Sequence, residues 1–299
     1  MKKRQPIFTI LLVLSCLVTG QVLAQNEKTI PILQSGADLE LKPGKNLLKI
    51  RFQGVVRDLF IELPRGMQKG EQYPLVFGFH GDGGPKEAYS RRLSPYVEKH
   101  KLIAISIQGT PKRVGSGASS WDHHHGSDVD VDDIGFIRYL VDYLDVTERV
   151  DLKRIYATGG SSGGLFCYRL AKETNLFAAI GPTKCGMIKG HHEPESMTEP
   201  LAIMQVIGNE DKSFHGSSNR LTMYSAEERI EIWRDFLNCD PKPSINTQIE
   251  GMTIRTYRSD KGSEVVYCML HGVGHSIPRS ILPVMDGLIV DFFMQRKKL

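Results

Sequence analysis

The segment from Arg154 to Gly164 reads Arg-Ile-Tyr-Ala-Thr-Gly-Gly-Ser-Ser-Gly-Gly and constrains the fold more than any other part of the chain. An apolar run rich in strand-forming residues ends in two glycines, and two serines and two more glycines then lead into a helix-like segment. This layout predicts a tight strand-to-helix turn, because only small residues tolerate the strained, closely packed backbone there. A serine at the tip of such a nucleophile elbow projects its hydroxyl above the sheet. The pattern therefore predicts a histidine and an acid further along the chain.

The position of the tip is ambiguous by one residue. The five-residue pattern fits residues 159–163, centred on Ser161, and also residues 160–164, centred on Ser162. The strand ends at position 158 or 159, which favours Ser161 and leaves Ser162 as the alternative. A phosphate-binding loop would need a Gly-Lys-Ser/Thr ending, which is missing. A plain glycine-rich turn is the structural alternative.

The two partners of the serine are expected further along the chain, first the acid and then the histidine. The apolar run 201–207 is followed by Gly-Asn-Glu-Asp, and Asp211 is the predicted acid, with Glu210 as the second choice. The last predicted strand leads into His-Gly-Val-Gly-His. His275 is the predicted base, because Gly274 frees its approach, and His271 is the alternative, packed at the strand end.

The negative charge of an acyl-transfer intermediate needs two backbone N–H donors. One is expected from Ser162, the residue after the nucleophile. The other is expected from the loop His-Gly-Asp-Gly-Gly that follows the buried run 74–80, with Asp82 as the first candidate and Gly81 as the second.

Strand-like and helix-like segments alternate along the chain, which predicts an α/β fold with a mostly parallel central sheet and helices on both faces. No linker interrupts residues 46–299, so a single catalytic domain is expected there. The predicted strands are 46–52, 56–63, 74–80, 102–107, 154–158, 177–180, 201–207 and 265–270. The predicted helices are 87–100, 132–144, 162–172, 226–237 and 281–293.

The N-terminus has the pattern of a signal peptide. Three basic residues at 2–4 precede an apolar run over 7–18, and small or apolar residues at 22–24 offer a cleavage site after Ala24. We expect a signal peptide over 1–24, an exposed lead-in over 25–45, and a secreted or periplasmic protein without a membrane span in its mature form. Lipid attachment at Cys16 is disfavoured by the poor lipobox before it.

Charge gives no reason to expect a nucleic-acid partner. The formal net charge of the chain is +4, and it falls to about +1 without the three basic residues of the predicted signal peptide.

Four cysteines remain after the predicted leader, an even number that permits disulfides in an exported chain. We expect Cys239, after one helix, to pair with Cys268 in the last strand. The state of Cys167 and Cys185 stays open. The three histidines at 123–125 lie near several aspartates, but adjacent histidines converge poorly on one ion and acids suit a helix start, so no metal is expected.

These motifs together resemble the family of secreted esterases that includes polyhydroxybutyrate depolymerases, feruloyl esterases and acetyl xylan esterases. The resemblance covers most of residues 45–296 and implies an α/β-hydrolase fold, with Ser161, Asp211 and His275 as the triad. It also supports the Cys239–Cys268 pair. The segments that carry it are 57–64, 74–84, 132–137, 158–164, 168–171, 177–180, 208–211, Trp233, Cys239 and 274–275.

The chain departs from the family at Ile277, where a tryptophan often contacts the acyl group or sugar. Trp121 and Ile277 are the candidate substrate contacts, and simple packing is the alternative for Trp121. The sequence thus predicts a serine ester hydrolase without a cofactor, acting on acetyl or feruloyl esters of plant polysaccharide. The alternatives are a polyhydroxyalkanoate depolymerase, a serine peptidase and a non-catalytic binding protein on the same fold.

Overall fold

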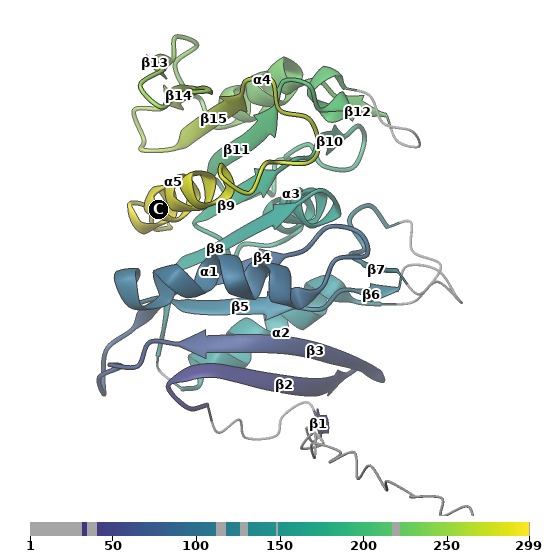
Figure 1. Ribbon diagram of the computed structural model, residues 1–299, viewed down its shortest axis with the longest axis vertical. Coiled ribbons are helices and arrows are strands. Elements are labelled where there is room, and N and C mark those ends of the chain that lie inside the picture. The colour runs from purple at the N-terminus through teal and green to yellow at the C-terminus, as the bar shows by residue number, and fades with distance from the viewer. Residues whose placement is uncertain are drawn as a thin grey trace, which may run out of the picture.

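The computed structural model describes residues 32–34, 41–111, 118–125, 131–147, 149–216 and 222–298 (Figure 1). The predicted signal peptide, 1–24, lies outside these residues. Part of the predicted lead-in is ordered as a short strand, β1, which pairs in parallel with the next strand. In the ranges just given, no helix is both long enough and apolar enough to cross a membrane.

A single large sheet forms the centre of the molecule, and its middle strands are parallel. Antiparallel strands flank this parallel block on both sides. In spatial order the strands are β1 Ile32–Gln34, β2 Gly44–Phe52, β3 Val55–Leu63, β5 Ile103–Ile107, β4 Tyr73–Phe79, β8 Val150–Gly160, β9 Ala179–Thr183, β11 Ala202–Gly208, β15 Glu264–Leu270, β14 Met252–Arg258 and β13 Ser244–Asn246. Two short ribbons lie outside the sheet, β6 Thr110–Pro111 with β7 Ser119–Ser120, and β10 Met187–Ile188 with β12 Met223–Tyr224.

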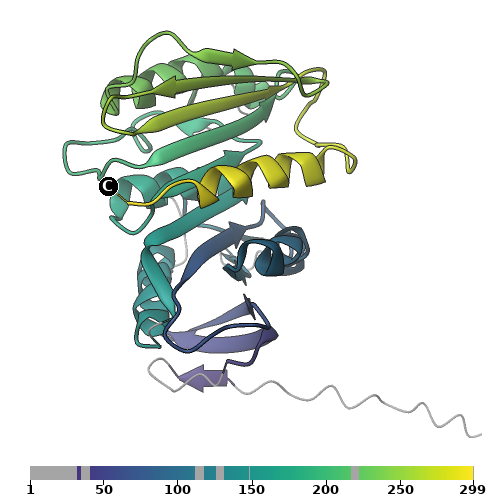
Figure 2. The same cartoon turned by 90° about the vertical axis from the view of Figure 1, so that its left-hand side faces the viewer.

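Helices cover both faces of the sheet, as Figures 1 and 2 show. One face carries α1 (Lys86–His100) and α5 (Leu282–Met294), whose apolar residues form one core layer with the sheet. The other carries α2 (Asp133–Asp145), α3 (Ser162–Glu173) and α4 (Ala226–Phe236), whose apolar residues form the second layer. The predicted α/β architecture is confirmed, and every predicted strand and helix is found with its bounds shifted by at most a few residues.

The antiparallel strands β13 and β14 were not predicted from the sequence. Strand β14 reads Met-Thr-Ile-Arg-Thr-Tyr-Arg, and only its first and sixth residues are buried. Strand β13 is exposed along its whole length. Strands at the margin of a sheet have solvent on one side, so they lack the continuous apolar run that marks the central parallel strands.

The predicted disulfide between Cys239 and Cys268 is absent. All four cysteines of the described ranges are free thiols. Cys239 belongs to the core layer that contains Tyr267, whereas Cys268 belongs to the layer on the opposite face. Because neighbouring residues of a strand point to opposite faces, the side chain of Cys268 is directed away from Cys239.

The turn between β8 and α3 is built by close backbone contacts that only glycine permits. A Cβ atom on Gly163 would lie 2.3 Å from the carbonyl oxygen of Phe79 and 2.6 Å from that of His80. A Cβ atom on Gly159 would lie 2.3 Å from the carbonyl oxygen of Gly163. These contacts press the start of α3 against the end of β4, so the loop after β4 and the turn after β8 meet at one edge of the sheet.

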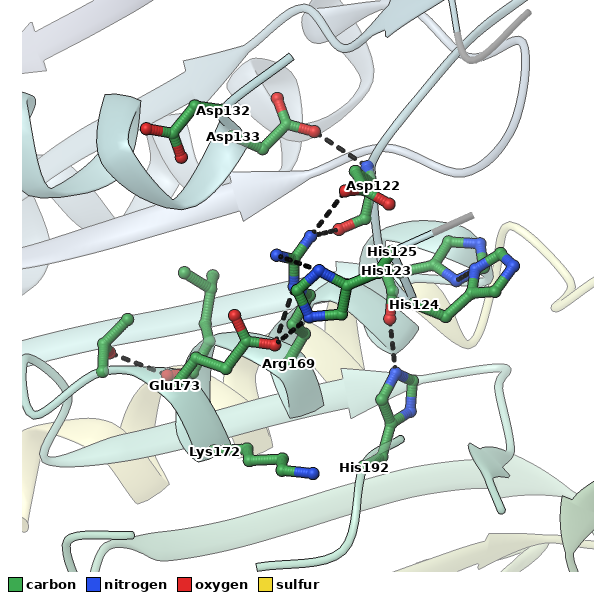
Figure 3. Close-up of polar contacts among 12 residues, drawn as sticks. Asp122, His123, His124, His125, Asp132, Asp133, Arg169, Lys172, Glu173 and His192 are labelled. Carbon is green, nitrogen blue, oxygen red and sulfur yellow. Dashed lines mark hydrogen bonds and ion pairs between the residues drawn. The ribbon is translucent and has the colours of Figure 1, made fainter. Parts of the chain in front are cut away.

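The segment 121–125 is tied to α3 by a network of charged side chains (Figure 3). Arg169 of α3 pairs with Asp122 at 2.9 Å and with Glu173 at 2.9 Å. His125 Nε2 lies 2.9 Å from the same carboxylate oxygen of Glu173. Since Arg169 is 7% exposed, its positive charge is stabilised by these carboxylates rather than by water.

A fully buried histidine joins this segment to a second loop. His192 Nδ1 accepts a hydrogen bond from the Ile188 N–H at 3.2 Å, so Nε2 carries the ring proton and donates to the His123 carbonyl at 2.6 Å. Burial lowers the pKa of His192 to about 4, although the bond to His123 partly opposes this effect. The neutral ring is therefore the form that holds the two loops together.

The glycine contacts at the turn give a stability prediction. We expect Gly163→Ala to lower the free energy of unfolding by about 3 kcal/mol, because the new methyl group meets backbone oxygens that cannot move aside. The matched control is Gly287→Ala in α5, where the nearest atom would be Tyr96 Oη at 3.5 Å. That variant should gain about 0.5–1 kcal/mol from helix propensity. Urea denaturation measures both, and equal midpoints for the two variants would contradict the packing argument.

The buried His192 gives a pH prediction. Its pKa in the folded protein is below the ordinary value of about 6.5, so the unfolded chain binds the proton first as the pH falls. The contribution of the neutral ring is complete above about pH 6.5 and is lost as the pH falls toward about 4, by up to about 3 kcal/mol. We expect His192→Gln to flatten the decline in unfolding free energy over this range, measured by urea denaturation at successive pH values. His191→Gln, at the exposed neighbour, serves as control, and the same slope in both variants would argue against His192.

Candidate active site

Ser161 lies at the tip of the turn, in a backbone conformation that few side chains adopt. Its φ is +57° and its ψ is −121°, and its N–H donates to the Thr183 carbonyl at 3.0 Å. This conformation directs the Ser161 hydroxyl out of the turn, 3.1 Å from His275 Nε2. Ser162, by contrast, is buried, and its hydroxyl has no hydrogen-bond partner in the described structure. Of the two candidate serines, the fold thus brings Ser161 to the histidine.

His275 lies in the loop between β15 and α5. Its Nδ1 is 2.7 Å from Asp211 Oδ2, and its Nε2 faces Ser161. The side chain is 55% exposed, so it is open to an incoming molecule. His271, the alternative from the sequence, is exposed at the end of β15 and contacts Thr253 Oγ1 at 2.8 Å. It lies at the strand end as expected, but it is exposed rather than packed, and no contact with the serine is found.

Asp211 follows β11 and caps the short 3₁₀ helix η1 (Lys212–His215). Its Oδ1 accepts hydrogen bonds from the Ser213 N–H at 2.9 Å and from the Ser213 hydroxyl at 2.7 Å, while Oδ2 faces His275. Burial by itself raises the pKa of the Asp211 carboxyl, but the hydrogen bonds from His275 and Ser213 outweigh it, and the net pKa is lowered. The second-choice acid, Glu210, is exposed.

The charge state of Asp211 fixes the tautomer of His275. With its pKa lowered, the carboxyl is ionised at neutral pH and can only accept hydrogen bonds. His275 Nδ1 therefore carries the ring proton and donates to Asp211, which leaves the Nε2 lone pair directed at the Ser161 hydroxyl. An imidazole in this state can take a proton from an alcohol.

The loop after β4 is organised by a buried histidine, His80. The Gly109 N–H donates to His80 Nε2 at 2.9 Å, so the proton is on Nδ1, which donates to the Gly81 carbonyl at 2.7 Å. Burial lowers the pKa of His80, which keeps the ring neutral. The Gly81 carbonyl also accepts from the Gly84 N–H at 2.9 Å, so the peptide plane after Gly81 is held from two sides.

This fixed peptide plane orients the next N–H group. In a trans peptide the C=O and N–H groups point in opposite directions, so the Asp82 N–H points away from His80. A Cβ atom on Gly81 would lie 3.2 Å from Ser161 Cβ, which places this loop against the serine. The Asp82 N–H has no acceptor among the described residues, and the Ser162 N–H is in the first turn of α3, where helical partners are missing. The loop after β4 and the first turn of α3 thus each bring N–H groups without an acceptor to the neighbourhood of Ser161.

The two candidate substrate contacts differ in exposure. Trp121 is fully buried, where it packs against Phe79 and Phe166 and donates from Nε1 to the His80 carbonyl at 2.8 Å. It therefore supports the loop after β4, and its burial favours the packing alternative over a substrate contact. Ile277 is half-buried at the edge of the core layer that includes α5, and its role as a contact stays a prediction.

Within the described residues, no group of three or more histidine, cysteine, aspartate or glutamate side chains is arranged to hold a metal ion. Of the aspartates near the three histidines, Asp132 caps α2 through the Gly135 N–H. Asp133 forms a buried ion pair with Arg57 at 2.6 Å. Asp128 and Asp130 lie outside the described residues.

The organising roles of His80 and Ser213 were not predicted from the sequence. His80 carried a signal, since it directly precedes the glycines of the predicted donor loop. Ser213 lies two residues after the acid, in a position from which a side chain and its own N–H can bond the same carboxylate. Neither role follows from residue type alone, because both depend on which atoms the fold leaves unpaired.

Comparisons with known proteins identify esterases that are similar to this chain. No protein-family profile matches the chain. A bifunctional acetylxylan esterase/xylanase of Neocallimastix patriciarum is 25% identical over 235 residues, which are 76% of this chain and 32% of that protein. Feruloyl esterase B of Piromyces equi is 24% identical over 238 residues, 74% of this chain and 42% of that protein. The chain thus spans less than half the length of these two relatives.

Solved structures show the same fold. An acetyl xylan esterase from Aspergillus awamori superposes with a TM-score of 0.57 at 16% identity, covering 83% of this chain and 98% of the other. A thermostable esterase superposes with a TM-score of 0.57 at 18% identity, covering 85% of this chain and 63% of the other. These likenesses support the resemblance found in the sequence: the chain has an α/β-hydrolase fold and is similar in sequence to an acetylxylan esterase/xylanase and to a feruloyl esterase.

Proposed function

We propose that the protein is an exported serine ester hydrolase that removes acetyl or feruloyl groups from plant polysaccharide. The observation that carries the proposal is the continuous hydrogen-bonded series from Ser161 Oγ through the His275 ring to the buried Asp211 carboxylate. The names of the relatives, an acetylxylan esterase/xylanase and a feruloyl esterase, support the choice of acyl group and polymer. The signal-peptide pattern over residues 1–24 supports export.

The chemistry follows from the proton positions. Ser161 Oγ attacks the ester carbonyl carbon while His275 Nε2 takes the serine proton, and Asp211 stabilises the imidazolium that forms. The Asp82 and Ser162 N–H groups donate to the oxyanion of the tetrahedral intermediate, with the Gly81 N–H as the alternative to Asp82. The C–O bond to the alcohol then breaks, and His275 returns its proton to the leaving oxygen. A water molecule repeats the sequence on the acyl-enzyme, releases the acid and restores Ser161.

The role of Ser161 is tested with an aryl ester. We expect Ser161→Ala to reduce kcat/KM for p-nitrophenyl acetate by about 10⁴-fold or more, because the nucleophile is removed while the fold is retained. Ser162→Ala is the matched control, since its hydroxyl makes no hydrogen bond, and it should stay within about tenfold of wild type. Loss of activity in Ser162→Ala together with retained activity in Ser161→Ala would place the nucleophile one residue later.

The acyl group and polymer are tested by product release. We expect free acid from acetylated xylan or from a feruloylated oligosaccharide, and none from a hydroxybutyrate oligomer, measured by chromatography with the Ser161→Ala variant as the blank. Release from the hydroxybutyrate oligomer alone would favour a polyhydroxyalkanoate depolymerase. Turnover of aminoacyl anilides without aryl esters would favour a peptidase, and failure of a fluorophosphonate probe to label Ser161 would favour a non-catalytic binding protein.

A further inference from the structure

A cavity of about 660 Å³ lies between α1 and the start of α5, and Arg279 of the segment before α5 also lines it. These two helices lie on the same face of the sheet (Figure 1), and they are joined by the Arg92–Asp286 ion pair and by a hydrogen bond from Tyr96 Oη to the Pro283 carbonyl at 3.1 Å. The walls are mostly apolar and include Tyr96 and Leu282, while the charged lining residues are Arg91, Arg92, Arg279 and Asp286. The reaction proposed at Ser161 does not use this cavity.

The charges around the cavity do not balance. Asp286 is the single acidic residue of the lining, and Arg92 holds it with two nitrogens, Nε at 3.0 Å from Oδ2 and Nη2 at 2.5 Å from Oδ1. Arg91 and Arg279 are exposed, and neither forms an ion pair with any residue that the structure describes. The carboxylate of Glu87, one helical turn before Arg91, instead pairs with Lys86 at 3.2 Å. Arg91 acts on the Glu87 carboxylate through its charge but does not pair with it, so two guanidinium groups line the cavity without an ion-pair partner among the described residues.

The cavity lies close to the proposed catalytic groups. Arg279 follows His275 by four residues, which span at most about 14 Å even when fully extended. On the other side, α1 begins directly after the loop that carries Asp82, and Arg91 is five residues into that helix, about 8 Å along its axis. A ligand in the cavity can therefore belong to the same molecule as the ester at Ser161.

We propose that this cavity binds a carboxylate-bearing sugar unit of the ester substrate, and that Arg91 and Arg279 determine specificity by binding its carboxylate. The planar guanidinium group matches the two oxygens of a carboxylate, and the apolar walls with Tyr96 suit the C–H face of a sugar ring. The substrate class is then an acidic polysaccharide rather than a neutral one. This inference rests on the proposed function only in placing the ester at Ser161, because the binding itself requires no catalysis.

The test compares one acidic oligosaccharide with its neutral counterpart. Isothermal titration calorimetry of the wild-type chain is carried out with a xylotriose that bears a 4-O-methylglucuronosyl group, and with the same compound after reduction of its carboxyl group to an alcohol. We expect the acidic compound to bind about tenfold more tightly, and this ratio to shrink as salt is added, because the interaction is electrostatic. In the double variant Arg91→Gln/Arg279→Gln the two compounds should bind equally.

Arg149→Gln is the matched control. Arg149 is exposed just before β8, at the end of that strand opposite Ser161, and its removal should keep the tenfold ratio. Hydrolysis of p-nitrophenyl acetate should be the same in the double variant and in wild type, which shows that the fold and the ester chemistry are intact. With acetylated forms of the two oligosaccharides, the double variant should raise KM for the acidic one and leave kcat unchanged.

The two proposals fail in different ways. Equal binding of the acidic and reduced compounds by the wild-type chain, including no binding of either, overturns the carboxylate site. So does a tenfold ratio that persists in the double variant. Activity of Ser161→Ala on p-nitrophenyl acetate equal to that of wild type overturns the catalytic assignment and leaves the binding result standing.

Discussion

The strained backbone of Ser161 is the constraint on which the rest of the site depends. A non-glycine residue at φ +57° and ψ −121° costs on the order of 1–3 kcal/mol and persists only where its surroundings hold it. Here the Ser161 N–H is bonded to Thr183 in the neighbouring strand, and the Ser161 carbonyl accepts from Gly164 and Leu165 at the start of α3. The sheet on one side and the helix on the other fix the residue, so its hydroxyl projects toward the loop that carries His275.

The buried and exposed parts of the site have different tasks. Asp211 is 3% exposed and fully hydrogen-bonded, whereas the His275 side chain is 55% exposed. Burial would disfavour the Asp211 charge, and the bonds from Ser213 and His275 compensate for it. In the proposed mechanism, the carboxylate that stays ionised is thus sheltered, and the histidine that reaches the substrate is open. On the other side of Ser161, the neutral His80 holds a backbone donor in place without adding a charge next to the oxyanion.

Much of the site could be predicted because its three main residues directly follow the ends of predicted strands. Ser161, Asp211 and His275 each follow an apolar run, and the carboxyl ends of parallel strands meet at one edge, so order and position were sufficient to bring them together. The prediction of a Cys239–Cys268 disulfide was wrong because proximity along the sheet does not determine which face a side chain occupies. Tyr267 and Cys268 are adjacent in β15, yet they belong to different core layers. Likewise, the residue type of Trp121 suited either a cleft or the core, and its burial depends on the loop packing against Phe79 and Phe166.

The openness of His275 has a consequence for the kind of substrate. A charge that develops on an exposed imidazole is partly screened by water, and the attraction of Asp211 and the backbone donors is strongest when that water is displaced. The His275 side chain is 55% exposed in the described structure, and in the proposed function the substrate takes the place of that water. An ester carried on a bulky chain covers more of His275 than a small free ester does. A chain that also reaches the cavity beside α1 would be held on both sides of Ser161, which fixes the carbonyl relative to the hydroxyl and reduces the entropy lost in the reacting step.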